Sequence, residues 1–174
     1  MNDPIIEAVL KREGGDTPLT AADHGGLTRF GITRPFLHTY GTEGQTVENL
    51  TVDDARAVYA AFMKATRIGD IVNDDLRGVV FDAAVLSGST AAIKTLQRAL
   101  GVRADGIIGN VTLAALPHLD GRKLALLFLC DRIDFLAAIT AGNLEDRDRD
   151  GIPDNLEMLR GWIRRATDQV RGLA

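Results

Sequence analysis

The sequence predicts a mostly α-helical fold with one small glycine-rich loop or β-hairpin near the N-terminus. Apolar residues recur with helical spacing along most of the 174-residue chain. Only residues 16–33 combine closely spaced glycines with the short pattern of turn-rich strands. A hydrophobic content of 45% and a single cysteine are typical of a globular chain without a disulfide framework.

Each expected helix has its own signals. The first begins at Asp3 and Pro4, an N-cap and a first helical residue, and ends before Gly14. Thr51 and Asp54 form a capping-box variant that opens another helix. The apolar spacing and the stop signals predict further helices over residues 76–83, 89–100, 120–141 and 155–171.

Charge and hydropathy exclude several classes of protein. The longest strongly apolar run, residues 124–130, is far shorter than the ~20 residues that span a bilayer, and we expect Cys130 within it to pack in the core. The N-terminus has no basic region or cleavage site, which predicts synthesis in the cytoplasm without a signal peptide. The net charge of −4 is carried entirely by residues 145–157. With no basic surplus elsewhere, nucleic acid is not an expected partner.

Glu13 is the first candidate for a functional carboxylate. It follows Val9 by four residues and Leu10 by three, so it lies on the apolar stripe of its own helix. The two glycines after it let the chain turn away, which could leave the carboxylate at the floor of a cleft. A carboxyl group partly removed from water keeps its proton more readily, as a general acid must. The alternative is a last-turn residue that reaches water.

Several motifs in order resemble one known family. They are Glu13-Gly14-Gly15, then Asp23-His24-Gly25-Gly26-Leu27-Thr28, then Gly31-Ile32-Thr33. This pattern resembles the bacterial and phage N-acetylmuramidases of glycoside hydrolase family 108. Residues 82–88, 96–113 and 161–162 are similar to the peptidoglycan-binding-type region of such enzymes. The resemblance implies one lysozyme-like domain over residues 1–174, with a catalytic half at 1–88 and a helical peptidoglycan-binding-type half at 89–174.

The activity that this resemblance implies is hydrolysis of the β-1,4 bond between N-acetylmuramic acid and N-acetylglucosamine. Glu13 would be the general acid, Asp23 the second carboxylate, and Thr28 a group that positions water. A carboxylate separation of roughly 6.5–9.5 Å would favour inversion and about 5 Å retention. Asp23 and Thr28 could instead serve only the structure of the loop. The resemblance also implies four substrate-binding residues: Gly26, Arg29, Phe30 and Asp82.

Residues 146–157 fit the calcium-loop pattern D-x-D-x-D-G-x5-E without a mismatch. Carboxylates crowded into twelve residues repel one another without a cation, so we expect one bound Ca²⁺ with a structural role. A solvated charged loop is the alternative. The expected ligands are Asp146, Asp148, Asp150, Ile152 through its carbonyl, Asp154 and Glu157.

Together these features predict a monomeric, endolysin-type peptidoglycan hydrolase that acts on the cell wall after holin-type or other release. The alternative is a non-catalytic wall-binding or assembly protein with a structural calcium site. Two features of the second half remain open. The loop from Asp105 to Thr112 could contact the wall but is favoured as a turn, and Trp162 is favoured as a core anchor.

Overall fold

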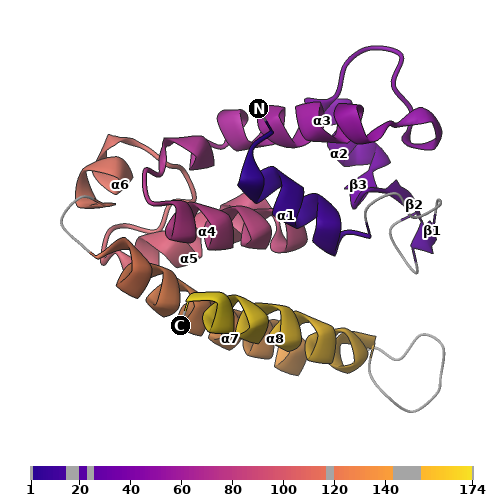
Figure 1. The fold of residues 1–174 in the computed structure, drawn as a ribbon. Coiled ribbons are helices and arrows are strands. Elements are labelled where there is room, and N and C mark those ends of the chain that lie inside the picture. The colour runs from indigo at the N-terminus through magenta and orange to yellow at the C-terminus, as the bar shows by residue number, and fades with distance from the viewer. Residues whose placement is uncertain (1, 15–19, 23–25, 117–119, 143–153, 174) are drawn as a thin grey trace. The chain divides into compact units, whose positions relative to one another are not determined.

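The computed structural model describes residues 2–14, 20–22, 26–116, 120–142 and 154–173. The chain forms two compact units, residues 1–70 and 71–174 (Figure 1). The prediction of a mostly helical fold with a small β-element near the N-terminus is confirmed. Within the described residues no helix is long and apolar enough to cross a membrane.

The first unit contains three helices and a small sheet among its described residues. The helices are α1 (Pro4–Arg12), α2 (Arg34–Tyr40) and α3 (Val52–Ala65), with short 3-10 turns at Val47–Asn49 and Ile68–Asp70. The strands β1 (Thr20–Ala22), β2 (Gly26–Arg29) and β3 (Ile32–Thr33) form an antiparallel sheet in the order β1-β2-β3.

The helix starts of this unit follow the expected capping chemistry. The Asp3 side chain accepts a hydrogen bond from the Ile5 amide at 2.8 Å, which satisfies one free N–H at the start of α1. At the start of α3, Thr51 and Asp54 form a reciprocal capping box. Helices α1 and α3 pack against each other. Apolar side chains from α1, the sheet, α2 and α3 fill the core of the unit.

The second unit is helical throughout its described residues. It contains α4 (Asp74–Ser87), α5 (Ser89–Ala99), α6 (Asn110–Ala115), α7 (Gly121–Gly142) and α8 (Asp154–Leu173). Helix α7 packs against α4, α5 and α8, and Figure 1 shows α7 and α8 side by side. Helix α4 packs against α5 and α7 and so belongs to the compact unit that begins at residue 71. The expected catalytic half at 1–88 and peptidoglycan-binding-type half at 89–174 stay a prediction.

Two details differ from the expectations. Cys130 is exposed, because the buried face of α7 repeats through Leu124, Phe128 and Leu129 and leaves Cys130 on the opposite side. The short helices α2 and α6 had no counterpart among the expected helices. Helix α6 begins at Asn110, with Gly109 as its N-cap.

Candidate active site

Glu13 stands at the C-terminal end of α1. It is the C-cap residue, and its amide donates to the carbonyl of Val9 at 2.9 Å. Its side chain is half-buried, whereas Ile6, Val9 and Leu10 of the same helix are fully buried. The helix therefore delivers a carboxylate from its apolar stripe to the edge of the core, as the spacing predicted.

The Glu13 side chain lies against the turn of the β2–β3 hairpin. A Cβ atom added to Gly31 would come within 2.7 Å of both the Glu13 Cγ and Oε2 atoms. Gly31 also has a φ of +74°, which favours glycine. Gly31 thus meets two requirements at once, a left-handed backbone and room for the carboxylate.

The turn itself is a two-residue loop in which both residues have positive φ. Arg29 pairs with Ile32 across the hairpin, and the connecting residues Phe30 and Gly31 have φ values of +56° and +74°. Two such residues are typical of a type I′ turn. The conformation is strained for a phenylalanine, so packing must hold it in place.

Tyr59 of α3 supplies that restraint. Its hydroxyl donates a buried hydrogen bond to the Phe30 carbonyl at 2.8 Å. The Phe30 side chain is 3% exposed, and the Tyr59 ring also neighbours Phe36 at a centroid distance of 5.9 Å. The turn that contacts Glu13 is therefore fixed from the core side by an aromatic group of α3.

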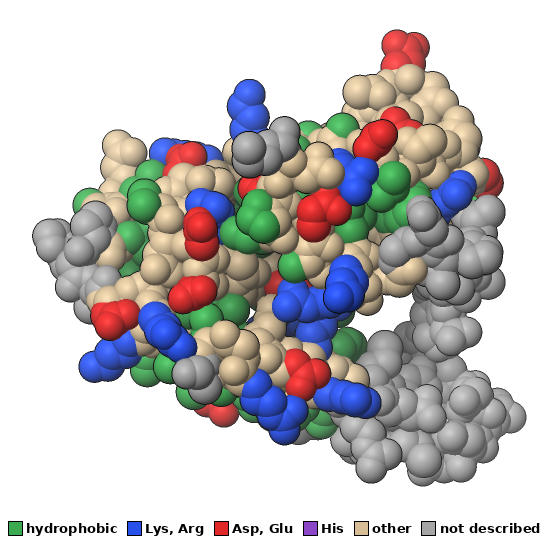
Figure 2. Space-filling model, in the orientation of Figure 1, with side chains coloured by type: hydrophobic (Ala, Val, Ile, Leu, Met, Phe, Trp, Pro, Cys, Tyr) green, Lys and Arg blue, Asp and Glu red, His purple; other side chains and the backbone are tan. Residues whose placement is uncertain are grey.

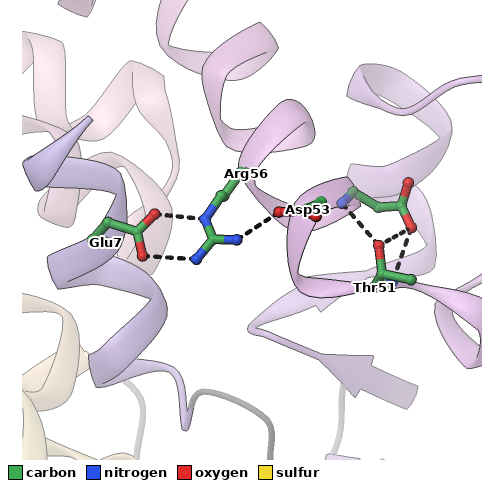
Figure 3. A network of polar contacts seen from close by, with 5 residues as sticks. Glu7, Thr51, Asp53 and Arg56 are labelled. Atoms are coloured by element: carbon green, nitrogen blue, oxygen red, sulfur yellow. Dashed lines mark hydrogen bonds and ion pairs between the residues drawn. The ribbon is translucent and has the colours of Figure 1, made fainter. Parts of the chain in front are cut away.

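Helix α1 is tied to α3 by a polar network (Figure 3). The Arg56 guanidinium donates to both carboxylate oxygens of Glu7, at 2.6 and 3.1 Å, and to Asp53 at 2.6 Å. A bidentate pair of this kind fixes orientation as well as distance. The hydrogen bond from Arg56 is the main cause that holds the pKa of Glu7 below its usual value of 4.5.

The partners proposed for Glu13 are only partly described. Thr28 lies in β2 opposite Thr33 of β3, and its side chain is half-buried. Asp23 lies outside the described residues, so its separation from Glu13, and with it the choice between inversion and retention, stays a prediction. Gly26 is the first residue of β2. The structure thus brings Glu13 to the hairpin that carries Thr28.

Three residues expected to bind substrate make contacts within the protein. The Phe30 ring is buried, and the Arg29 guanidinium lies 5.4 Å from the centre of that ring and donates to the Glu48 carbonyl at 3.0 Å. Asp82 is 0% exposed, in the second unit. Its carboxylate pairs with Arg132 at 3.0 Å and Arg165 at 2.7 Å. This geometry favours structural roles for Phe30 and Asp82, because neither side chain reaches the surface.

The side chain of Gln97 forms several hydrogen bonds with the Asp105 loop of the second unit. Its Nε2 atom lies 2.8 Å from Asp105 Oδ1, 3.0 Å from the Ile107 carbonyl and 3.1 Å from Thr112 Oγ1, while its Oε1 accepts from the Gly106 amide at 2.8 Å. The bond from Gln97 is the main cause that lowers the pKa of Asp105. The polar groups of the loop form hydrogen bonds within the protein. This favours a structural role as a turn over contact with the cell wall.

The candidate calcium loop falls almost wholly outside the described residues. Asp146, Asp148, Asp150 and Ile152 are among the residues that the structure does not describe, and α8 begins at Asp154. Glu157 lies in the first turns of α8, and its side chain is not described either. Among the described residues no cluster of three or more metal-binding side chains occurs. The calcium site therefore stays a prediction.

Charged side chains are mixed on the surface that Figure 2 draws. Lys and Arg side chains stand among Asp and Glu side chains on its described part. Recognition of a ligand on this face would depend on local contacts rather than on long-range attraction.

Comparisons with known proteins agree with the fold. Residues 6–88 match the family described as glycosyl hydrolase 108, and residues 91–167 match the family described as "Predicted Peptidoglycan domain". The solved structure of SagA from Brucella abortus is similar, with 25% identity and a TM-score of 0.75 over 97% of this chain and 90% of that chain. No curated protein matches at a significant level.

The mostly helical fold and the family match over residues 6–88 define a glycoside hydrolase. With the peptidoglycan domain that follows it, the chain is a peptidoglycan hydrolase, and peptidoglycan is its substrate partner. Both parts of the predicted resemblance, the family 108 motifs and the peptidoglycan-binding-type second half, are thereby confirmed. Neither match bears on calcium.

Proposed function

We propose that the enzyme is an N-acetylmuramidase that hydrolyses the β-1,4 bond between N-acetylmuramic acid and N-acetylglucosamine, with Glu13 as the general acid. One observation carries the proposal. The Glu13 carboxylate is half-buried at the end of α1 and is seated against the Gly31 backbone. A carboxyl group fixed in this position could donate a proton to the glycosidic oxygen as the bond breaks.

Asp23 and Thr28 complete the proposed mechanism. As the leaving sugar takes the proton from Glu13, positive charge develops on the muramic acid ring, and a nearby Asp23 carboxylate would stabilise it. The Thr28 hydroxyl would orient the attacking water or the carboxylate. The position of Thr28 on the hairpin strand that leads into the Phe30–Gly31 turn supports this role.

The first experiment measures the release of reducing ends from purified peptidoglycan by the wild type, Glu13→Gln and Glu43→Gln. Glu43 is an exposed carboxylate of the same unit and serves as the matched control. We expect full activity in the wild type and in the control, and a loss of at least about 10²-fold in Glu13→Gln. Equal activity in all three proteins would reject Glu13 as the acid.

The chemical form of the products tests the bond that is cut. Borohydride reduction converts the new reducing end to an alcohol, and mass spectrometry then distinguishes muramic acid from glucosamine at that end. We expect reduced N-acetylmuramic acid. A glucosamine end would contradict the muramidase assignment, and an anhydro sugar, which forms without water, would contradict hydrolysis.

We also propose that residues 146–157 bind one Ca²⁺ that stabilises the start of α8. The donor pattern of the loop supports this, as does the start of α8 at the ninth loop position, Asp154. The test compares melting temperatures with Ca²⁺ and with EGTA for the wild type, Asp148→Asn and the control Asp134→Asn. Calcium should raise the melting temperature of the wild type and the control only. A lytic activity that is unchanged by EGTA would leave the ion no regulatory role.

Finally, we propose that the enzyme works as a monomer of endolysin type, which reaches the wall from the cytoplasm after the membrane is opened. The proposal follows from the resemblance to phage-related muramidases. Expression in bacteria should cause lysis only when a holin-type pore or a permeabilising agent is also supplied. Lysis without either, or a dimer in sedimentation, would contradict it.

A further inference from the structure

A pocket of about 490 Å³ lies in the second unit, at the junction of α4 and α5 and beside α7. It is distant in sequence from Glu13 and is formed within one unit. Hydroxyl groups, two cations and one aromatic ring line it: Ser87, Ser89, Thr90, Lys94, Arg98 and Phe135. None of the described residues that line it is acidic.

The two cations of this pocket have no acidic partner among the described residues. Lys94 and Arg98 are four residues apart on α5, so they lie on the same side of the helix, where their like charges repel each other. Neither side chain forms an ion pair or a hydrogen bond within the described part of the chain. An anion in the pocket would remove this repulsion.

The pocket is also partly preorganised. A Cβ atom added to Gly106 would come within 3.5 Å of the Lys94 Cε atom and 2.9 Å of the Thr90 Cγ2 atom. The stem of Lys94 therefore lies along the Asp105–Gly106 loop, which Gln97 holds in place. A side chain restrained in this way loses less freedom when it binds a ligand.

We propose that this pocket binds a carboxylate-bearing stem peptide of peptidoglycan. The proposal rests on peptidoglycan being the substrate and deepens the proposed function. The glycan strand itself is neutral once its lactyl group is amidated, so the anionic groups of the polymer belong to its peptides. Lys94 and Arg98 would pair with a carboxylate, the hydroxyls would bond to peptide groups, and Phe135 would contact an alanine methyl group.

The test uses a synthetic stem tetrapeptide with free carboxylates and its fully amidated counterpart, so that neither cleavage nor the glycan takes part. Binding is measured by calorimetry with the full-length wild type, with Lys94→Gln/Arg98→Gln, and with the control Lys123→Gln/Arg164→Gln. The control removes the same charge from exposed cations of the same unit. We expect the wild type and the control to bind the free peptide at least about tenfold more tightly than the pocket variant does.

Three outcomes would overturn the proposal. The first is that the pocket variant binds the free peptide as tightly as the wild type does. The second is that the wild type binds the amidated peptide as tightly as the free peptide. The third is that the wild type binds polyglycerol phosphate, an anionic wall polymer of a different class, more tightly than the free peptide. Amide chemical shifts that change around residues 87–98 on titration would support it, whereas changes confined to other elements would refute it. Peptide binding without any release of reducing ends by the wild type would contradict only the muramidase proposal, so the two failures are distinguishable.

Discussion

Replacing Gly31 by alanine tests whether the hairpin turn positions Glu13. The new Cβ atom would stand 2.7 Å from the Glu13 Cγ and Oε2 atoms, whereas ordinary contacts begin at 3.4 Å. The carboxylate must therefore move by about 0.7 Å. Since a misplacement of about 1 Å in a reacting group can cost about 10²-fold in rate, the loss should approach that size. The left-handed backbone of residue 31 adds a separate cost of roughly 1–2 kcal/mol to folding.

The matched control for this substitution is Gly44→Ala. Gly44 has a φ of +84°, so alanine is strained there too, but no atom lies within 4 Å of the added Cβ. Both variants should melt about 2–8 °C below the wild type, because 1 kcal/mol corresponds to about 2–4 °C for a chain of this size. Only Gly31→Ala should lose activity in the reducing-end assay. Activity within threefold of the Gly44→Ala value would refute the positioning argument.

Three further substitutions test other contacts. Tyr59→Phe leaves the buried Phe30 carbonyl without its donor and should cost about 1–3 kcal/mol in a urea melt, together with a fall in activity. Asp82→Asn removes the buried carboxylate that pairs with the buried Arg132 and the half-buried Arg165, and should cost about 3–5 kcal/mol; a melting temperature within 2 °C of the wild type would contradict the buried ion pair. Glu7→Gln should be less stable than the wild type at neutral pH. Because Arg56 lowers the pKa of Glu7 in the folded state, this advantage is present above pH 4.5 and is lost as the pH falls through the lowered value, so thermal melts of the two proteins should converge in acid.

Local chemistry made much of the fold predictable. The start of α1 follows from an acceptor at Asp3 and a fixed φ at Pro4, and the start of α3 from a capping box, all within four residues of sequence. The short helix α2 was missed because seven residues are too few to show a periodic apolar stripe. Cys130 was misplaced because a continuous apolar run does not tell which of its residues face the core.

The candidate site was predictable only in part for a similar reason. The place of Glu13 on an apolar stripe follows from spacing within one helix. Its contact with Gly31 joins residues of two elements, and no local pattern gives the distance between them. The G-I-T motif marked Gly31 as a position of interest, but the reason for the glycine, room for a carboxylate, needs the folded chain. Nothing in the spacing of Tyr59 indicated that its hydroxyl supports the same turn.

Helix α3 emerges as the common support of the site. Arg56 and Tyr59 are three residues apart on it and so lie on neighbouring positions of one helical face. Arg56 holds α1, the helix that ends in Glu13, and Tyr59 holds the turn against which the Glu13 side chain rests. Helix α3 thus fixes both the helix that carries Glu13 and the turn that limits the movement of the Glu13 side chain. A preorganised acid requires both restraints, because a side chain anchored only at its backbone would sample several rotamers.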